Sequence, residues 1–153
     1  MIPYNPKSDG DNTQRKGNTM SEKKYELTKD VLTTASGSKV YRIRAVRTFT
    51  NGKNTIEAGT YGGYVESEKN LSHDGGAWVY GVARAYENAV VEGNAALRGL
   101  VAAKGNAVIG GDIIVSGTGD IDGNISITGN RPIHLNGEIL AGEGTLTLNK
   151  KHY

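Results

Sequence analysis

A repeat of six residues constrains this chain more strongly than any other feature of its sequence. From Val65 to Asn130 the first and third positions of each hexad are small or branched apolar residues, the fifth is usually Gly and the sixth is often Asn or Asp. A short period of this kind is typical of a parallel β-helix, in which each hexad supplies one short strand and one corner. The repeat therefore predicts an all-β solenoid, and it leaves the function open because solenoids serve many functions.

The first and third positions are predicted to line the interior of the solenoid. Alternate side chains of a strand point to opposite faces, so these two positions share one face and the second position faces outward. Small and branched residues suit a narrow interior in which successive coils stack closely. The predicted interior pairs are Ala77/Val79, Ala83/Ala85, Ala89/Val91, Ala95/Leu97, Val101/Ala103, Ala107/Ile109, Ile113/Val115, Gly119/Ile121 and Ile125/Ile127.

Three hexads with sharp corners form one triangular coil, so residues 18 positions apart are expected to stack. The corners need a tight turn, where Gly adopts a positive φ at little cost. Asn at the sixth position tolerates the same conformation and can cap the turn. The predicted corner glycines are Gly81, Gly93, Gly99, Gly105, Gly111, Gly117, Gly123 and Gly129.

The hexads resemble those of the hexapeptide-repeat proteins, whose best-known members are acyltransferases with a left-handed β-helix. Here Gly usually comes one residue later, and bulkier residues such as Tyr80 and Lys104 take the earlier place. This A-x-V-x-G-N form resembles a family of phage and prophage hexapeptide proteins, as do the upstream segments YELT, YRIRAVRTF and residues 59–81. Residues 119–130 (GDIDGNISITGN) resemble the right-handed, polymer-forming bactofilins. The first resemblance implies a left-handed parallel β-helix, and the second leaves the right-handed form open.

The sequence divides into four segments. Residues 1–22 are polar and turn-rich, which predicts a disordered extension. Residues 23–64 contain alternating strand-like runs separated by turns, which predicts a small β-rich cap over the first coil, since solenoids need covered ends. Residues 65–149 form the predicted parallel β-helix, with a register slip expected at Arg131-Pro132 and another before Leu146. Residues 150–153 are a charged tail expected to discourage edge-to-edge pairing.

Composition limits the classes of partner. The net charge of +2 is too small to predict nucleic-acid binding. The chain has no run of 18 apolar residues, so we expect no transmembrane helix and no membrane partner. Its amino terminus lacks an apolar signal-peptide core, and it has no Cys for disulfides or thiolate metal sites. With the phage resemblance, this composition favours the cytoplasm of a host cell.

The second hexad position contains apolar residues where solvated ones would be expected. Such a patch commonly marks an interface, and closed cyclic assembly is the default for identical chains. We therefore predict a homo-oligomer, and the resemblance to hexapeptide-repeat proteins favours a trimer. Scattered exposed apolar residues are the alternative explanation. The predicted interface residues are Trp78, Val90, Ala96, Val108 and Ile114.

Catalytic groups are scarce. Hexapeptide acyltransferases use a histidine as general base, and His73, next to Asp74, is the only candidate with a nearby carboxylate that could orient it. A packed or capping histidine at the cap junction is the favoured interpretation. The dispersed histidines form no ligand cluster, so we expect no metal site, and no sequence motif predicts a cofactor.

Recognition-type side chains gather near the junction between the cap and the first coil. Tyr, Trp and Arg are over-represented in binding hot spots. The alternative is that these aromatics attach the cap to the first coil, and both can hold. The predicted binding residues are Tyr61, Tyr64, Trp78, Tyr80, Arg84 and Tyr86.

These observations favour a non-enzymatic, self-associating β-helix that binds another macromolecule. The phage resemblance implies a counter-defence role, such as inhibition of a CRISPR complex or another immune complex of the host. Three alternatives stay open: a small-molecule or nucleotide-signal sponge that binds at subunit clefts, a divergent acyltransferase that uses His73, and a polymer-forming scaffold. The scaffold is favoured only if the carboxy-terminal coil is uncapped.

Overall fold

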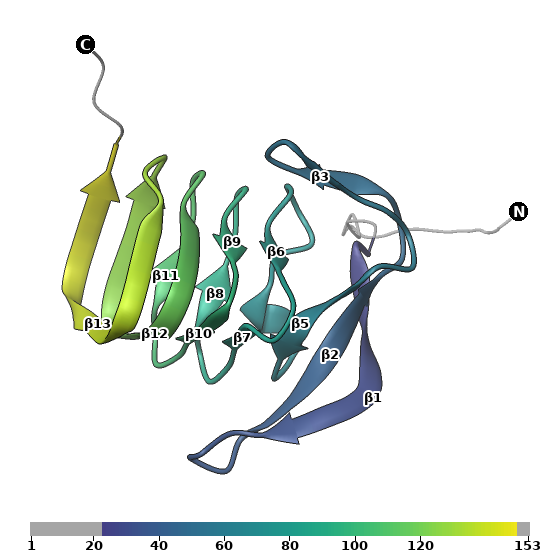
Figure 1. Cartoon of the computed structure of the whole chain (residues 1–153), viewed down its shortest axis with the longest axis horizontal. Helices are drawn as coiled ribbons and strands as arrows, with labels where there is room; N and C mark the ends of the chain where they lie inside the picture. Colours follow the sequence, from purple (N-terminus) through teal and green to yellow (C-terminus); the bar gives the residue numbers. More distant parts are fainter. Residues whose placement is uncertain (1–22, 150–153) are drawn as a thin grey trace, which may run out of the picture.

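The computed structural model of the chain describes residues 23–149 and shows an all-β protein (Figure 1). A parallel β-solenoid of about five turns forms most of it, and antiparallel strands cover its amino-terminal end. The predicted fold class, an all-β parallel solenoid with a β-rich cap, is confirmed. Its left-handed sense stays a prediction from the resemblance. The predicted disordered extension (residues 1–22) and the predicted charged tail (residues 150–153) lie outside the described residues.

The cap contains a long antiparallel ribbon and a short hairpin. The ribbon pairs β1 with β2, and β2 pairs antiparallel with β5. The hairpin pairs β3 with β4 through a two-residue turn at Gly52-Lys53, where Gly52 has a φ of 59°. Figure 1 shows the hairpin and the ribbon on opposite sides of the solenoid axis. The cap strands are β1 (Tyr25–Thr33), β2 (Lys39–Ala45), β3 (Phe49–Asn51), β4 (Asn54–Ile56) and β5 (Tyr61–Val65).

The solenoid begins where β5 pairs parallel with the first repeat strand on that face. A 3₁₀ turn, η1 (Glu68–Asn70), completes the first corner. Strands lengthen toward the carboxy-terminal end, where the last two coils are each continuous. The solenoid strands are β6 (Trp78–Val79), β7 (Arg84–Ala85), β8 (Val90–Val91), β9 (Ala96–Leu97), β10 (Leu100–Ala103), β11 (Val108–Ile109), β12 (Ile114–Gly129) and β13 (Ile133–Leu148).

Residues 18 positions apart stack, as the hexad period predicts. On one face Trp78 lies beside Ala96, and Ala96 beside Ile114. The same spacing holds on the other two faces for Arg84 with Ala102 and for Val90 with Val108. The three hexads of a coil therefore form three separate parallel ladders, and equivalent corners lie directly above one another.

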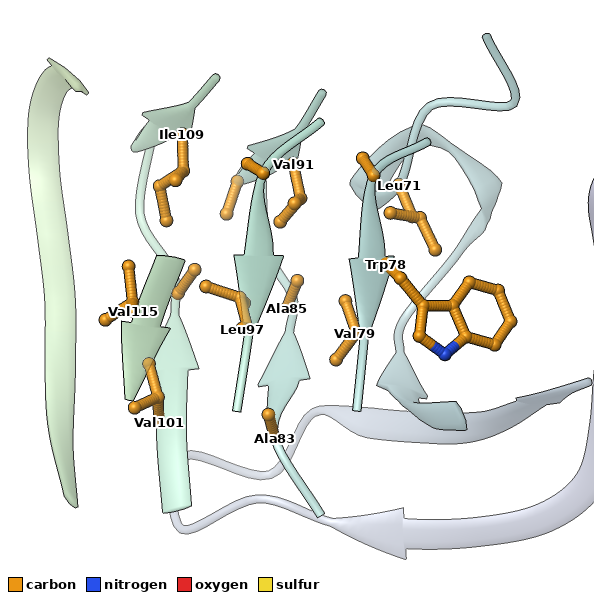
Figure 2. Close-up of a cluster of buried hydrophobic side chains, with 14 of the residues drawn as sticks. Leu71, Trp78, Val79, Ala83, Ala85, Val91, Leu97, Val101, Ile109 and Val115 are labelled. Atoms are coloured by element: carbon orange, nitrogen blue, oxygen red, sulfur yellow. The ribbon is translucent and has the colours of Figure 1, made fainter. Parts of the chain in front are cut away.

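The interior is lined as predicted. Every predicted interior residue except Gly119, which is partly exposed, is at most 7% exposed. Figure 2 shows Val79, Leu97 and Val115, from three successive coils, directed into the same interior. Burial of such branched side chains stabilises the fold by roughly 1.5–3 kcal/mol each.

The corners also follow the prediction. All eight corner glycines have a positive φ, between 60° and 122°. At the equivalent corner of one hexad Glu87 adopts a φ of 58°, which costs a non-glycine residue energy. Its carboxylate accepts a hydrogen bond from the Gly105 amide of the next coil at 2.9 Å, which offsets part of that cost.

The predicted register slips are wrong in position. Ile133 lies beside Val115, which is still 18 residues away, so Arg131-Pro132 is not an insertion. The one shift between the last two strands lies between Thr118 and Gly119, opposite Gly137, and from there to Leu148 the offset stays at 19 residues. Arg131 occupies a nominal interior position at a corner, where its guanidinium donates to the Asn149 carbonyl at 3.1 Å. A charged residue at that position made the register appear to slip.

Candidate functional site

Trp78 is covered by the cap of its own chain. It is 1% exposed and contacts Phe49 of β3 edge-on, with ring centroids 5.2 Å apart. Tyr25 of β1 also meets it edge-on, at 6.4 Å. Ala96 is fully buried. The prediction that these two outward positions form an exposed interface is therefore wrong, because the β3–β4 hairpin folds over that face (Figure 2 draws Trp78 within the buried cluster).

Of the predicted interface residues, Ile114 is the most exposed, at 40%. Val90 and Val108 are half-buried on a different ladder of the solenoid. Association through these three residues stays a prediction.

The predicted aromatic binding surface does not assemble. Tyr64 and Tyr86 are 4% and 6% exposed and belong to a small second core with Val40 and Ala102. The Arg42 guanidinium lies 5.0 Å from the centre of the Tyr64 ring and donates to its hydroxyl at 2.9 Å. Burial raises the pKa of Tyr86. These two tyrosines attach the β1–β2 ribbon to the solenoid, which is the alternative interpretation.

The remaining predicted binding residues are separated from one another. Tyr61 is 58% exposed at the start of β5, and Arg84 is half-buried on β7. Tyr80 is half-buried beneath the β3–β4 hairpin, where the Arg98 guanidinium lies 4.3 Å from the centre of its ring. The Tyr80 hydroxyl contacts Asn51 and Asn54 of that hairpin.

His73 joins the cap to the first coil. Its Nδ1 accepts the Lys24 backbone N–H at 2.9 Å, so the neutral ring carries its proton on Nε2. Nε2 lies 2.7 Å from Glu68 Oε1, and the ring stacks on Tyr25 at 4.3 Å. The hydrogen bond from His73 lowers the pKa of Glu68. Glu68 therefore orients the imidazole, and the prediction that Asp74 does so is wrong.

Lys24 forms a second contact at the same junction. Its residue is fully buried, and Nζ donates to the Ala77 carbonyl at 2.6 Å and to the Gly75 carbonyl at 3.3 Å. The ammonium also lies 5.0 Å from the centre of the Phe49 ring. Burial lowers the pKa of Lys24 to about 8. The ionisable side chains of this junction, Lys24, His73 and Glu68, therefore make their contacts within the protein.

A groove of about 410 Å³ lies between the β3–β4 hairpin and one corner of the solenoid. The hairpin turn forms one wall, a column of corner residues forms the other, and apolar side chains form part of the floor. The lining residues are Asn51, Gly52, Lys53, Asn54, Asn94, Asp112, Ile114, Asn130 and Pro132.

Asn51 holds the hairpin wall in place. It is 4% exposed, and its Nδ2 donates to the carbonyls of Gly76, Asn94 and Ala95 at 2.8, 3.0 and 3.3 Å. Its Oδ1 accepts the Tyr80 hydroxyl at 2.5 Å. All of the polar atoms of this side chain are therefore used to dock the hairpin on the first two coils. The hairpin wall is positioned before any ligand arrives.

The corner wall is a polar column built by the 18-residue stacking. Asn94 Oδ1 accepts the Gly76 N–H at 3.1 Å, and its Nδ2 donates to Asp112 Oδ1 at 3.3 Å. Asn130 continues the column on the next coil. Lys53 adds a cation to the hairpin wall, and Asp112 adds an anion to the corner wall. The groove therefore combines a cation and an anion with the apolar surface of Ile114 and Pro132.

Sequence reasoning missed most of this groove. Ile114 was predicted as an exposed apolar residue, and Asn94 and Asn130 as corner caps. The strand-like runs and turns of residues 23–64 predicted a β-rich cap but not where its β3–β4 hairpin would dock. The 18-residue spacing of Asn94, Asp112 and Asn130 is the one feature of the sequence that could have identified the polar wall.

Among residues 23–149 no group of three His, Asp or Glu side chains is placed to hold a metal ion. Within the same range no helix is long and apolar enough to span a bilayer.

Comparison with known proteins identifies no relative. No protein family, curated protein or solved structure matches this chain.

Proposed function

We propose that this chain is a non-enzymatic binding protein that holds an extended segment of a host protein in the groove between the β3–β4 hairpin and the Asn94/Asp112/Asn130 column. The observation that carries the proposal is the docking of the hairpin by Asn51, whose polar atoms all bind within the fold. Because the hairpin wall is already ordered, less conformational entropy is lost when a ligand binds.

The chemistry of the groove suits a polypeptide. Asp112 offers carboxylate oxygens and Lys53 an ammonium to the backbone N–H and C=O groups of an extended peptide. The apolar floor at Ile114 and Pro132 suits alternate side chains of such a segment. Lys53 and Asp112 give the groove a cation and an anion on opposite walls, which favours one orientation of a charged segment.

His73 supports a binding role over acyl transfer. A general base needs a nitrogen free to reach the acceptor. Both nitrogens of His73 bind within the cap junction, to the Lys24 N–H and to Glu68. Its ring face also packs on Tyr25. These contacts favour a structural role for the imidazole at the cap junction.

The phage resemblance of the hexads supplies the biological setting. We place the protein in the cytoplasm of a host cell, where it occupies a surface of a host complex and so acts in counter-defence against a CRISPR or another immune complex. The partner is then a protein, and its bound segment is extended.

A small-molecule sponge is the second candidate, favoured by one observation. The groove volume of about 410 Å³ falls within the range of small-molecule sites. Native mass spectrometry of the purified protein separates the two functions. A sponge carries additional small mass under gentle conditions and releases it on denaturation, whereas a protein binder shows the mass of the chain alone.

Capture of a partner from host lysate tests the groove directly. The Lys53→Glu/Ile114→Arg variant reverses the groove cation and blocks its floor, so we expect at least tenfold less captured partner. The matched control is Lys39→Glu/Val31→Arg, which makes the same changes on the exposed β1–β2 ribbon. Equal loss in both variants, or capture unaffected by the groove variant, would refute a role for the groove.

A further inference from the structure

Among the described residues, the last coil, β13, has apolar interior side chains that are only half-covered. Val115, Ile121 and Ile127 of the coil before it are at most 1% exposed. Their neighbours Ile133, Leu140 and Leu146 occupy the equivalent interior positions on β13 yet are only half-buried. Leu148 is half-buried as well. The difference arises because no described strand follows β13 (Figure 1).

The backbone of this coil is unpaired on the same side. β13 pairs with β12 from Ile133 to Leu148 and with no other described strand. An exposed edge of this length is a template for pairing with another chain. Figure 1 shows β13 at the end of the solenoid opposite the cap, so this open edge faces along the solenoid axis, away from the cap. The half-buried interior side chains of β13 lie at the same end.

We propose that this end binds the same end of a second copy, so that two molecules join tail to tail through their β13 coils. The last coil of a second copy has the same triangular outline and can therefore cover this end, just as β13 covers β12 within each molecule. The amino-terminal end is closed by Tyr25, Phe49 and Trp78, each at most 8% exposed. Head-to-tail stacking is thereby blocked, and a twofold pair is the closed assembly that this end permits.

The size of the contact is adequate for such a pair. A strand coil of this length, at about 3.3 Å per residue and roughly 10 Å wide, presents on the order of 500 Å² per copy. Two copies together bury on the order of 1,000 Å², which is the lower bound for a specific interface. An interface of this size is typical of a weak, reversible pair.

Sedimentation of the full chain tests the proposal. The Leu146→Lys/Leu148→Lys variant places two charges on the open end, so we expect its mass to be half that of the unaltered protein at the same concentration. The control, Val31→Lys/Leu32→Lys, makes the same exchange on exposed positions of the cap and keeps the full mass. This assay is independent of the groove, so its failure leaves the proposed function standing. Equal masses for all three proteins overturn the tail-to-tail pair.

Single cysteines provide a second readout that does not depend on the charged variant folding. The chain has no cysteine, so an introduced one can form a disulfide only with another copy. We expect rapid, reducible dimers from at least one position of the last coil and none from the control positions Lys39 and Lys53. Cross-linking at the controls to the same extent would overturn the proposal. The positions scanned are Ile139, Ala141, Thr145 and Thr147.

Discussion

Replacing Asn51 by Ala should undock the β3–β4 hairpin and destabilise the cap. The side chain donates to three carbonyl oxygens and accepts one hydroxyl, almost fully shielded from water. The Ala95 carbonyl keeps its bond from the Trp78 N–H, so the net loss is smaller than four bonds. At roughly 0.5–1.5 kcal/mol for each remaining bond, the free energy of unfolding should fall by about 2–4 kcal/mol.

Fluorescence of Trp78 measures this effect well. It is the one tryptophan of the chain and it packs against Phe49 of the hairpin, so its emission reports the cap, while far-UV circular dichroism reports the solenoid. In urea, the Asn51→Ala variant should lose its native Trp78 fluorescence at a lower concentration than its circular dichroism signal. Asn51→Asp keeps the shape but directs a carboxylate at carbonyl oxygens, so it should lose at least as much.

Asn54→Ala is the matched control in the same hairpin. Asn54 makes one exposed hydrogen bond, to the Tyr80 hydroxyl at 3.4 Å, so its removal should cost less than about 0.5 kcal/mol. If Asn51→Ala is no more destabilising than Asn54→Ala, the hairpin is not held by the Asn51 side chain. The preorganised groove would then lose its physical basis.

Three further predictions concern the cap junction and the last coils. His73→Ala should lower the stability reported by Trp78 by about 1–3 kcal/mol in urea unfolding, because the Lys24 N–H and Glu68 lose their partner. The folded pKa of Lys24, about 8, lies below its ordinary value of 10.5, so the unfolded chain binds more protons between these values. Urea midpoints should therefore rise with pH above about 8, and Lys24→Met should remove the rise. Gly117→Ala should cost more than about 2 kcal/mol in thermal unfolding, since Gly117 has a φ of 94° and a Cβ there would meet the Leu135 carbonyl oxygen. Gly142→Ala, in open space, should be neutral.

The hexad period predicted the interior because stacking in a solenoid is a local rule. Each interior position depends only on its own hexad and on the residue 18 positions away, so pairs such as Ala95/Leu97 followed directly from the sequence. The same rule placed Trp78 on an outward position correctly. It could not show that a separate hairpin folds over that position, since docking of the cap is a long-range contact.

The groove and the histidine illustrate the same limit. Asn51 lies 43 residues from Asn94, and no sequence period links them. His73 is next to Asp74 in sequence, yet the η1 turn brings Glu68 to its ring instead. The register error at Arg131 had a different origin, because a charged residue at a corner was treated as a break in the pattern although the stacking continues through it.

Hydrogen exchange of the protein with and without its captured partner shows whether the partner binds in the groove. We expect slower exchange of the backbone amides at residues 51–54, 94, 112, 114 and 130, which line the groove. Amides of the β1–β2 ribbon should exchange at the same rate in both samples. Protection confined to that ribbon, or to the edge of β13, would contradict binding in the groove.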